Sequence, residues 1–435
     1  MAPAYKKRLA GRHVAAVACF DSFAKTAMTL LAACRKEGAE TTLHLLEIPN
    51  RSLSRRQRLE IRRIDPRTRI EHGRWDGFRK LAAGMAGTLD VLYLGLDGQR
   101  SRDALLQLKA VWGATPERPV LVSAYPGILF RFALEGMLDR SGVDLLCLNS
   151  QQDLETYRRG CAALGMDSSN AVLTGLPILW RVEKRRKEPD VPSIVFFEQP
   201  SIPVHPLQRR FLCRQLKELA QAHPRHPVIF KPRTSSLERT LHRSHGEMSG
   251  VIDRMSRSVP NLQLSFKPAT RLLRHCGCAI TVSSTAALES MTMGVSTKIV
   301  SDLGVTETLG NHFFAESGCI ASFDEIVQDP FTPTHDKGWL MSNGLQPQGM
   351  ESFLSAILTC LARGVGPLQD DSTGPAAWGS MSWQSFAIRQ GGRRMLSSGG
   401  ARSSQLKRHQ TRSLFRRIRD GLVGFGWLSK VLRGR

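Results

Sequence analysis

The stretch CAITVSSTAALESMTMGVSTKIV, residues 278–300, is the part of the sequence that most clearly decides the fold. Short apolar runs within 278–284 and 296–302 each predict a buried strand. The segment between them favours a helix, and Gly294 is a typical residue at which a helix ends. A strand, a helix and a further strand in direct succession predict a parallel α/β sheet.

Three hydroxyl residues, Ser283, Ser284 and Thr285, lie where this strand passes into the helix. Such a strand ends at the carboxyl edge of the sheet, where the helix N-terminus offers free N–H groups and a positive dipole. Small hydroxyl residues can cap the helix and let a phosphate approach it. Glu289, about one turn into the helix, suits the paired hydroxyls of a ribose. The alternative is a plain N-cap with Glu289 in solvent.

Alternating strand and helix patterns continue through most of the chain. The N-terminal half contains apolar runs that predict buried strands at 13–20, 41–48, 90–96, 119–125 and 144–150. The C-terminal half adds predicted strands at 193–199, 226–231 and 261–266. Helical patterns occur at 24–36, 77–86, 207–223, 270–275 and 350–362. This alternation predicts parallel sheets covered by helices on both faces.

The charged, proline-containing segment 179–193 is the predicted boundary between two units. We therefore expect an α/β protein with two Rossmann-like domains facing across a cleft, the GT-B architecture, in which the ligand lies between the domains. The N-terminal domain is expected at 1–185, and the C-terminal domain at 190–365. Residues 366–435 are expected to form a flexible linker and a basic amphipathic tail.

The composition is that of a globular protein long enough for two domains. The chain has 435 residues, 41% of them hydrophobic, and no uncharged apolar stretch long enough to cross a bilayer. Its N-terminus has a basic start and a short apolar segment, which we interpret as the first core strand. The nine cysteines form no CxxC pair and no zinc spacing, which predicts reduced, mostly buried thiols in a cytosolic protein.

The net charge of +23 is unevenly distributed. From Arg389 to the C-terminus there are 13 Lys/Arg against one acid, Asp420. In residues 411–435 apolar side chains recur mostly at three- and four-residue steps, and basic ones can occupy the other face. This pattern favours an anionic membrane surface and predicts a cytoplasmic protein, peripherally attached to the inner face of the cell membrane. A disordered or nucleic-acid-binding tail is the alternative, but we expect no nucleic-acid partner.

Five blocks along the chain carry a family resemblance. The first is TVSSTAALESMTMGV followed by SDLGVTETLGNHFFAESGCI, and the second is ACFDSFAK at 18–25, with its D-S-aromatic-x-K loop. The others are PVLVSAYPGI at 119–128, LCLNSQQDLETY at 146–157 and VFFEQPSIP at 195–203. Together they resemble a family of bacterial glycosyltransferases of unassigned function, over residues 12–335. The resemblance implies a nucleotide-sugar donor bound by the C-terminal domain at 190–365, with the N-terminal domain at 1–185 on the acceptor side.

Two motifs of the second half are similar to those of bacterial sialyltransferases, GT-B enzymes that use a CMP-activated nonulosonic acid. FKPRTSS at 230–236 resembles their Lys-Pro-His-Pro motif, and TVSST at 281–285 their Ser-Ser/Thr motif. We expect Lys231 and Arg233 to contact phosphate, with a surface ion pair as the alternative. Arg233 stands in place of the motif histidine, and arginine cannot be a general acid near neutral pH, although it can clamp a phosphate or carboxylate. Protonation of the leaving group, if needed, is assigned to His242, with His245 and His205 as further candidates.

Further candidate site residues lie at strand ends or in the turns that follow. Asp21, at the end of the first strand, is the predicted base for the acceptor hydroxyl, and helix capping is its alternative. Lys25, about one turn further on, can hold an acidic acceptor or the donor carboxylate, or it is solvated. The other substrate-binding candidates are Ser22, Pro126, Gly127, Gln199, Pro200 and Asp302. Simple turns or a helix cap explain most of this last group equally well.

The predicted reaction is a metal-independent, inverting transfer of a sialic-acid-like sugar from a CMP donor to a cell-surface glycan or glycolipid precursor. No DxD pair suited to a divalent ion lies in a predicted strand-end loop, so no metal or other cofactor is expected. Two alternatives stay open. One is an enzyme of the same fold resembling nucleotide-sugar 2-epimerases, and the other is a non-catalytic basic protein that binds nucleic acid or acts as a scaffold.

Overall fold

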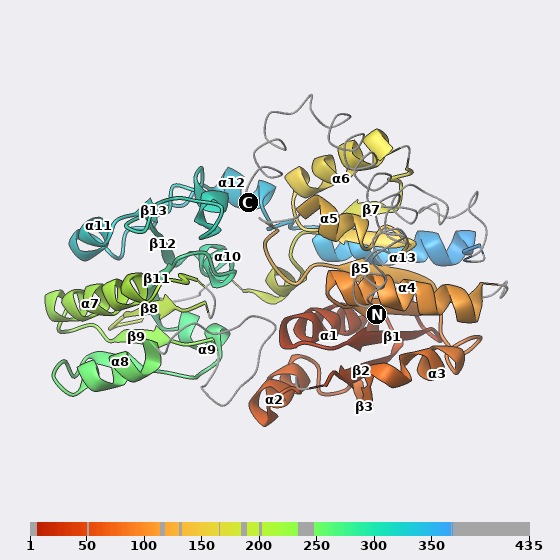
Figure 1. Cartoon of the computed structure of the whole chain (residues 1–435), viewed down its shortest axis with the longest axis horizontal. Coiled ribbons are helices and arrows are strands. Elements are labelled where there is room, and N and C mark those ends of the chain that lie inside the picture. The colour runs from red at the N-terminus through yellow and green to blue at the C-terminus, as the bar shows by residue number, and fades with distance from the viewer. Residues whose placement is uncertain are drawn as a thin grey trace, which may run out of the picture.

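The protein consists of two α/β domains that lie side by side, the N-terminal one at the right of Figure 1 and the C-terminal one at the left. The computed structural model describes residues 7–49, 52–113, 118–129, 133–164, 166–183, 189–199, 202–233, 248–366 and 368. Each domain contains one parallel sheet with helices on both faces, which confirms the predicted fold class. Of the tail predicted at 366–435, the structure describes only residues 366 and 368, and Leu368 is buried in the core of the first domain.

The N-terminal domain is built on a seven-stranded sheet in the order β3-β2-β1-β4-β5-β6-β7. Its strands are β1 (His13–Ala18), β2 (Glu40–Glu47), β3 (Arg69–Arg74), β4 (Val91–Gly95), β5 (Val120–Ala124), β6 (Leu145–Leu148) and β7 (Ala171–Leu173). The strand order reverses between β1 and β4. In parallel α/β sheets, ligands bind outside the carboxyl ends of the strands at such a reversal.

Six helices and two 3-10 turns complete this domain. They are α1 (Asp21–Lys36), α2 (Arg55–Ile64), η1 (Trp75–Gly77), α3 (Phe78–Ala83), α4 (Gly98–Trp112), α5 (Ala133–Leu138), α6 (Gln151–Leu164) and η2 (Pro177–Arg181) among the described residues. Helix α2 starts with a capping box, in which the Ser54 hydroxyl accepts the Gln57 N–H and the Gln57 side chain accepts the Ser54 N–H. The cap fixes the start of a helix that later contributes to the site.

The C-terminal domain has a six-stranded sheet in the order β10-β9-β8-β11-β12-β13. Its strands are β8 (Ser193–Phe197), β9 (Val228–Lys231), β10 (Leu262–Leu264), β11 (Cys276–Thr281), β12 (Ser296–Val300) and β13 (Ile320–Ala321). Its helical segments are α7 (Pro206–Ala222), α8 (Met248–Ser256), α9 (Ala269–Leu273), α10 (Ala286–Thr292), η3 (Asn311–Phe314), α11 (Phe323–Gln328) and α12 (Lys337–Ser342). Here the order reverses between β8 and β11, so the loop after β11 is also placed for ligand binding.

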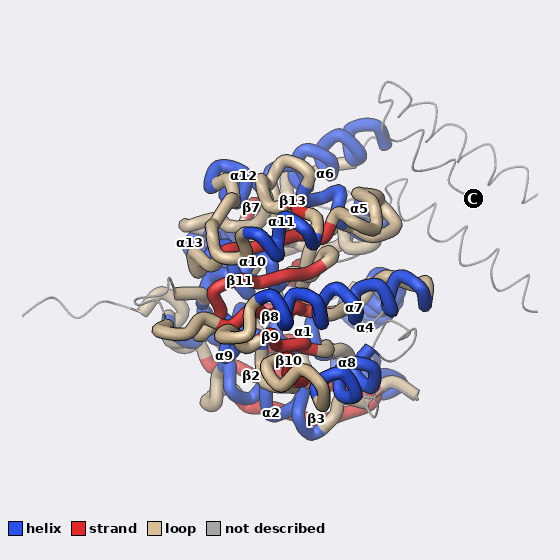
Figure 2. Tube along the Cα trace, turned by 90° about the vertical axis from the view of Figure 1, so that its left-hand side faces the viewer, coloured by secondary structure: helices blue, strands red, loops and turns tan. Residues whose placement is uncertain are grey.

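Strand β8 explains why helices cover both faces of the C-terminal sheet. Its side chains alternate between the faces, and all of them are buried. Ile194 and Phe196 join the core under α7 and α8, whereas Val195 and Phe197 join the core under α9 and α10. Figure 2, which looks onto this domain, shows α7 and α8 on one side of the strands and α9 on the other.

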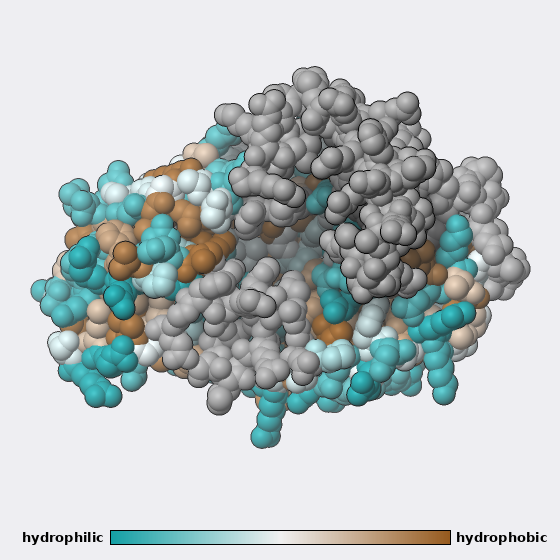
Figure 3. Space-filling view, viewed as in Figure 1, coloured by the Kyte–Doolittle hydropathy of each residue, from teal (hydrophilic) through white to brown (hydrophobic). Residues whose placement is uncertain are grey.

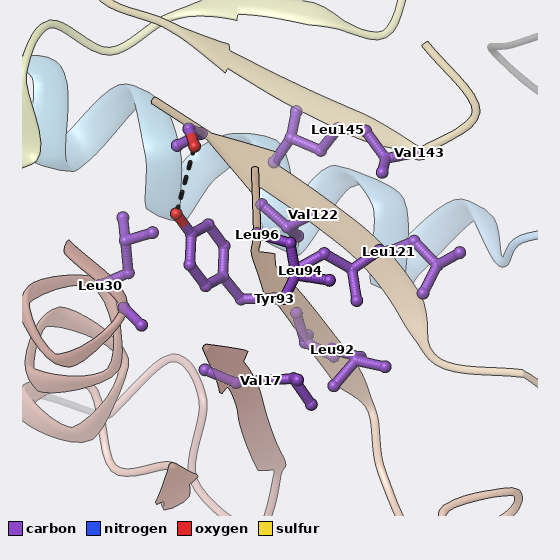
Figure 4. Packing of buried hydrophobic residues seen from close by; sticks show 14 of the residues in the cluster. Val17, Leu30, Leu92, Tyr93, Leu94, Leu96, Leu121, Val122, Val143 and Leu145 are labelled. Carbon is purple, nitrogen blue, oxygen red and sulfur yellow. Dashed lines mark hydrogen bonds between the residues drawn. The ribbon is translucent and has the colours of Figure 1, made fainter. Parts of the chain in front are cut away.

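The core of the N-terminal domain fills the space between its sheet and the flanking helices. Figure 4 shows Tyr93 of β4 between Val17 of β1, Leu30 of α1 and the leucines of neighbouring strands. The Tyr93 hydroxyl donates to the carbonyl oxygen of Ala124 at 3.4 Å, which supplies a partner for this buried polar atom. The ring can therefore occupy the core without an unsatisfied hydroxyl.

Helix α13 (Gly349–Arg363) crosses back to the N-terminal domain. Its apolar face, with Phe353, Leu354 and Ile357, belongs to the core cluster formed by the N-terminal strands. The Phe353 and Trp180 ring centroids lie 5.6 Å apart. The range 190–365 expected for the second domain therefore includes a helix that packs against the first, because its amphipathic pattern alone does not indicate which surface it covers.

Two further predictions concern the whole fold. All nine cysteines are free and buried, which confirms the expected reduced thiols. Within the described residues, no helix combines the length and apolar character needed to span a bilayer.

Candidate active site between the domains

The hydroxyl run after β11 is partly structural. Ser283 is 3% exposed, and its backbone N–H donates to Gln199 Oε1 at 2.9 Å. Its hydroxyl donates to the Leu309 carbonyl oxygen at 2.5 Å and lies 3.1 Å from Gln199 Oε1. Gln199, a predicted substrate contact, therefore joins the ends of β8 and β11, and the polar groups of Ser283 are engaged within the protein.

Ser284 and Thr285, which follow Ser283, are half-buried. The Ser284 hydroxyl accepts the Ala286 N–H at 3.3 Å, at the start of α10. Thr285 contacts the turn after β5, because a Cβ placed on Gly127 would lie 3.1 Å from Thr285 Cγ2. The Asn149 side chain holds this turn by donating to the Gly127 carbonyl oxygen at 2.8 Å. Pro126, half-buried, precedes the contact.

Glu289 is buried in α10, not solvated, and the alternative that placed it in solvent is wrong. It is 5% exposed, and no hydrogen bond to its carboxyl group occurs among the described residues. Burial raises the pKa of Glu289 to about 7, although Lys25 and Lys231 act in the opposite direction. Glu289 thus lies near cations of both domains.

Lys231 is the last residue of β9 and is 9% exposed. Its ammonium donates to the Pro232 carbonyl oxygen at 2.7 Å. Burial lowers the pKa of Lys231 to about 8, and the positive charge of Arg56 adds to this, while Glu60 opposes it. Arg233, two residues on, is exposed, and its carbonyl oxygen lies 3.5 Å from the Arg56 guanidinium.

The N-terminal domain meets these residues with a chain of ion pairs. Lys25 Nζ lies 3.0 Å from Asp21 and 2.7 Å from Glu60, and Arg56 Nη1 lies 2.6 Å from Glu60. Burial lowers the pKa of Lys25, but the two carboxylates outweigh it, so that the pKa is raised. For Glu60 burial raises the pKa and Lys25 lowers it, with a net decrease. We call Lys25, Arg56, Glu60, Lys231 and Glu289 the junction cluster.

Asp21 is the first residue of α1, where the strand order reverses. The N-cap is Phe20, and Asp21 pairs with Lys25 rather than capping the helix with its side chain. Its Oδ1 atom is buried and has no hydrogen-bond partner among the described residues. Ser22 follows and is half-buried. An acceptor oxygen without a partner is the feature that a base needs.

The sequence did not point to Arg56 and Glu60, which lie on a helix that was not predicted. They form an i, i+4 pair, a pattern typical of any solvated helix. A capping box at Ser54 and Gln57 was the signal for this helix, but only the packing of α2 against α1 brings Glu60 to Lys25.

Other predicted residues have structural partners or lie elsewhere. Asp302 accepts the Phe323 N–H at 3.0 Å, at the start of α11. His205 is the N-cap of α7, where its Nδ1 accepts the Leu207 N–H. Pro200, His242 and His245 lie outside the described residues. Among the residues that the structure describes, no group of three or more His, Cys, Asp or Glu could hold a metal ion.

Comparison with known families adds to this geometry. Residues 14–359 match the model of a family described as "Putative glycosyltransferase (DUF6716)". The chain belongs to this family. This match agrees with the resemblance found in the sequence blocks. The matched residues include both domains and most of α13. No curated protein matches the sequence.

Solved structures place this family member in the GT-B fold. It is similar to a putative UDP-N-acetylglucosamine 2-epimerase from Listeria monocytogenes, with a TM-score of 0.55 and 12% identity over 82% of this chain and 98% of that one. A UDP-GlcNAc 2-epimerase from Neisseria meningitidis bound to UDP-GlcNAc has a TM-score of 0.53 and 11% identity, with 81% of this chain and all of that one covered (100%). At such low identity these similarities establish the fold alone, and they do not link the family member to sialyltransferases.

Proposed function

We propose that this protein is a metal-independent, inverting glycosyltransferase that moves a sialic-acid-like sugar from a CMP donor to a cell-surface glycan or glycolipid precursor. The observation that carries the proposal is the junction cluster, in which Lys25 and Arg56 of one domain meet Lys231 and Glu289 of the other. Membership of the glycosyltransferase family and the GT-B fold support it.

The donor is proposed to bind on the C-terminal side of the junction. Lys231 has a pKa of about 8, so it is mostly charged at neutral pH and can stabilise the phosphate that leaves the sugar. Arg233 can add a bidentate contact, since its guanidinium needs no deprotonation. The ribose hydroxyls would donate to the Glu289 carboxylate, which otherwise has no hydrogen-bond partner among the described residues.

The acceptor is proposed to bind on the N-terminal side, beside Asp21. Lys25 holds Asp21 Oδ2 at 3.0 Å, which leaves Oδ1 as the oxygen that can take the proton of the acceptor hydroxyl. The contact between Gly127 and Thr285 would keep the two half-sites in register. We further propose that the protein works in the cytoplasm at the inner face of the cell membrane, where a lipid-linked acceptor is found.

The main competing donor is a UDP-sugar. The Neisseria meningitidis neighbour is a UDP-GlcNAc 2-epimerase bound to UDP-GlcNAc, which makes a 2-epimerase-like activity the second candidate. The two candidates differ in what they need, because an epimerase converts UDP-GlcNAc without any acceptor. Incubation with UDP-GlcNAc alone, followed by analysis of the sugar at C2, therefore separates them.

The deciding experiment is a thermal-shift panel with CMP, UDP, GDP and CDP. We expect stabilisation by CMP in the wild type, and loss of that stabilisation in Lys231→Ala and Ser284→Ala. Stabilisation by UDP alone would favour the epimerase-like candidate. The absence of a response to every nucleotide would contradict both.

A further inference from the structure

Helix α2 has three different faces, which follow from its sequence at 3.6 residues per turn. Gln57 and Ile61, at 3% and 0% exposure, pack against the domain. Arg56 and Glu60 lie about a third of a turn away and belong to the junction cluster. The remaining face carries Arg55, Arg58, Leu59, Arg62 and Arg63. We call these five residues the outer face of α2.

The outer face of α2 is strongly basic. Arg55, Arg62 and Arg63 are exposed, and none of them forms an ion pair within the described part of the chain. Arg58 has a long contact with Glu47, at 3.7 Å between two partly exposed groups, which contributes little to stability. No acidic residue lies on this face, so its charge is directed to solvent.

An apolar side chain lies in the middle of these arginines. Leu59 is 47% exposed, one helical turn after Arg55 and one before Arg62 and Arg63. In the segment after α2, Arg67, Arg79 and Lys80 are also exposed, whereas Arg69 and Arg74 pair with Glu71 and Asp76. Figures 1 and 2 both show α2 and β3 at the lower edge of the domain, and Figure 3 shows mainly hydrophilic residues there.

We propose that the outer face of α2 docks on an anionic phospholipid membrane. Arginines can pair with lipid phosphates while their aliphatic stems and Leu59 enter the headgroup region. Single-stranded nucleic acid is the less suitable partner, because binding it normally needs exposed aromatic rings. None of the described aromatic residues at this edge is among the exposed large hydrophobic side chains.

The docking surface lies directly beside the proposed acceptor site, because Arg56 and Glu60 are on the same helix. A lipid-linked acceptor in the membrane would therefore reach the junction cluster without crossing the domain. The inference deepens the proposed location at the membrane by naming the surface that docks there, and it does not depend on the proposed reaction, since membrane binding needs neither donor nor acceptor.

The test is co-sedimentation of the full-length chain with vesicles of phosphatidylcholine alone, and with vesicles in which about one lipid in three is phosphatidylglycerol. The variant combines Arg55→Gln, Arg62→Gln and Arg63→Gln. The matched control combines Arg210→Gln, Arg214→Gln and Arg225→Gln, which removes the same charge from exposed positions in and after α7. We expect the α2 variant to lose about tenfold or more of the partition to anionic vesicles, while the control keeps most of it.

Raised salt should weaken the wild-type partition, and phosphatidylcholine vesicles should bind little protein. Equal partition of the wild type and the α2 variant would overturn the proposal, as would an equal loss in the control. Wild-type binding to single-stranded DNA, without binding to anionic vesicles, would overturn it in favour of nucleic acid. The CMP-induced thermal shift, measured on the same proteins, reports separately on the proposed function.

Discussion

The strand-to-helix junctions after β1 and after β11 meet between the domains, yet they use their polar groups differently. After β1, Lys25 is paired with Asp21 and Glu60 of its own domain. After β11, Ser283 is engaged by Gln199, whereas the carboxyl group of Glu289 has no hydrogen bond among the described residues. The N-terminal half-site is thus already organised by ion pairs. The C-terminal half-site keeps a buried carboxyl group beside a buried lysine, which suits a ligand with both hydroxyls and phosphate.

The largest effect is expected from a substitution of Asp21, in the N-terminal half-site. Asp21→Asn removes the proposed base, and we expect kcat to fall about 10²–10⁴-fold. Transfer can be measured as CMP release in the presence of donor and acceptor. The CMP-induced thermal shift should stay unchanged, because Asp21 does not belong to the donor side.

Asp97→Asn is the matched control for this prediction. Asp97 follows β4, the neighbouring strand, and its carboxylate pairs with Arg100 at 2.6 Å. If both variants lost activity to the same extent, a general disturbance of the sheet edge would explain the loss better than a base at Asp21.

The next largest effect is expected from a substitution of Lys231, the proposed phosphate contact in the C-terminal half-site. Lys231→Met should weaken CMP binding about 10–100-fold, since a charged hydrogen bond to phosphate is lost. Calorimetric titration with CMP measures this change. Lys298→Met is the control, because Lys298 is also a buried strand lysine, 6% exposed, that donates to a backbone carbonyl group. A similar loss in both variants would count against a phosphate role for Lys231.

A third prediction uses the pH dependence of Glu289. Burial raises its pKa to about 7 from the ordinary 4.5, so between these values the folded protein holds a proton that the unfolded chain has released. The contribution of this carboxyl group to stability is therefore present at low pH and is lost as the pH rises towards 7. Glu289→Gln should raise the free energy of unfolding at pH 8 by about 1–3 kcal/mol while weakening CMP binding.

Glu198→Gln is the matched comparison for Glu289→Gln. Burial raises the pKa of Glu198 to about 7 as well, but its carboxylate accepts from the Arg209 guanidinium at 3.3 Å. Because the neutral form is still favoured in the folded state, Glu198→Gln should also raise stability at pH 8, by about 1–3 kcal/mol. It should leave CMP binding largely unchanged, since Glu198 is not a proposed ribose partner. Thermal unfolding at pH 5 and pH 8, together with calorimetric titration with CMP, compares the two glutamates, and an equal loss of CMP binding in both variants would count against a ribose role for Glu289.

The smallest expected effect concerns the contact between the two junctions. Gly127→Ala places a methyl group 3.1 Å from Thr285 Cγ2, which requires the Thr285 side chain or the turn to give way by a few tenths of an ångström. We expect a severalfold change in the KM for the acceptor, with little change in stability. Gly77→Ala, where a Cβ meets nothing within 4 Å, should leave the KM unaltered.

Most of the sheet could be predicted because its central strands are continuous apolar runs. The prediction missed β3, whose sequence RIEHGR is polar, and the short strands β7 and β13. All three lie at the edges of their sheets, where one side is not covered by a neighbouring strand. An edge strand does not need a continuous apolar sequence, so periodicity alone does not reveal it.

The candidate site was predictable in part, because strand ends are visible in sequence. Asp21, Lys231 and Thr285 all lie at or near the carboxyl ends of strands, and the structure brings them to the junction between the domains. Ser283 and Asp302 share this position in sequence, but their hydrogen bonds to Leu309 and Phe323 give them structural roles. A hydroxyl or carboxylate in a loop does not reveal which way its side chain will turn.

The sequence by itself determined the central strands of both sheets, the two-domain division and the burial of the cysteines, because burial leaves a local pattern of apolar residues. Only the tertiary structure decided that α13 returns to the first domain and that Lys25, Arg56 and Glu60 stand opposite Lys231 and Glu289. These contacts join residues far apart in the chain. Their free energy depends on distance and burial, which no local stretch of sequence contains.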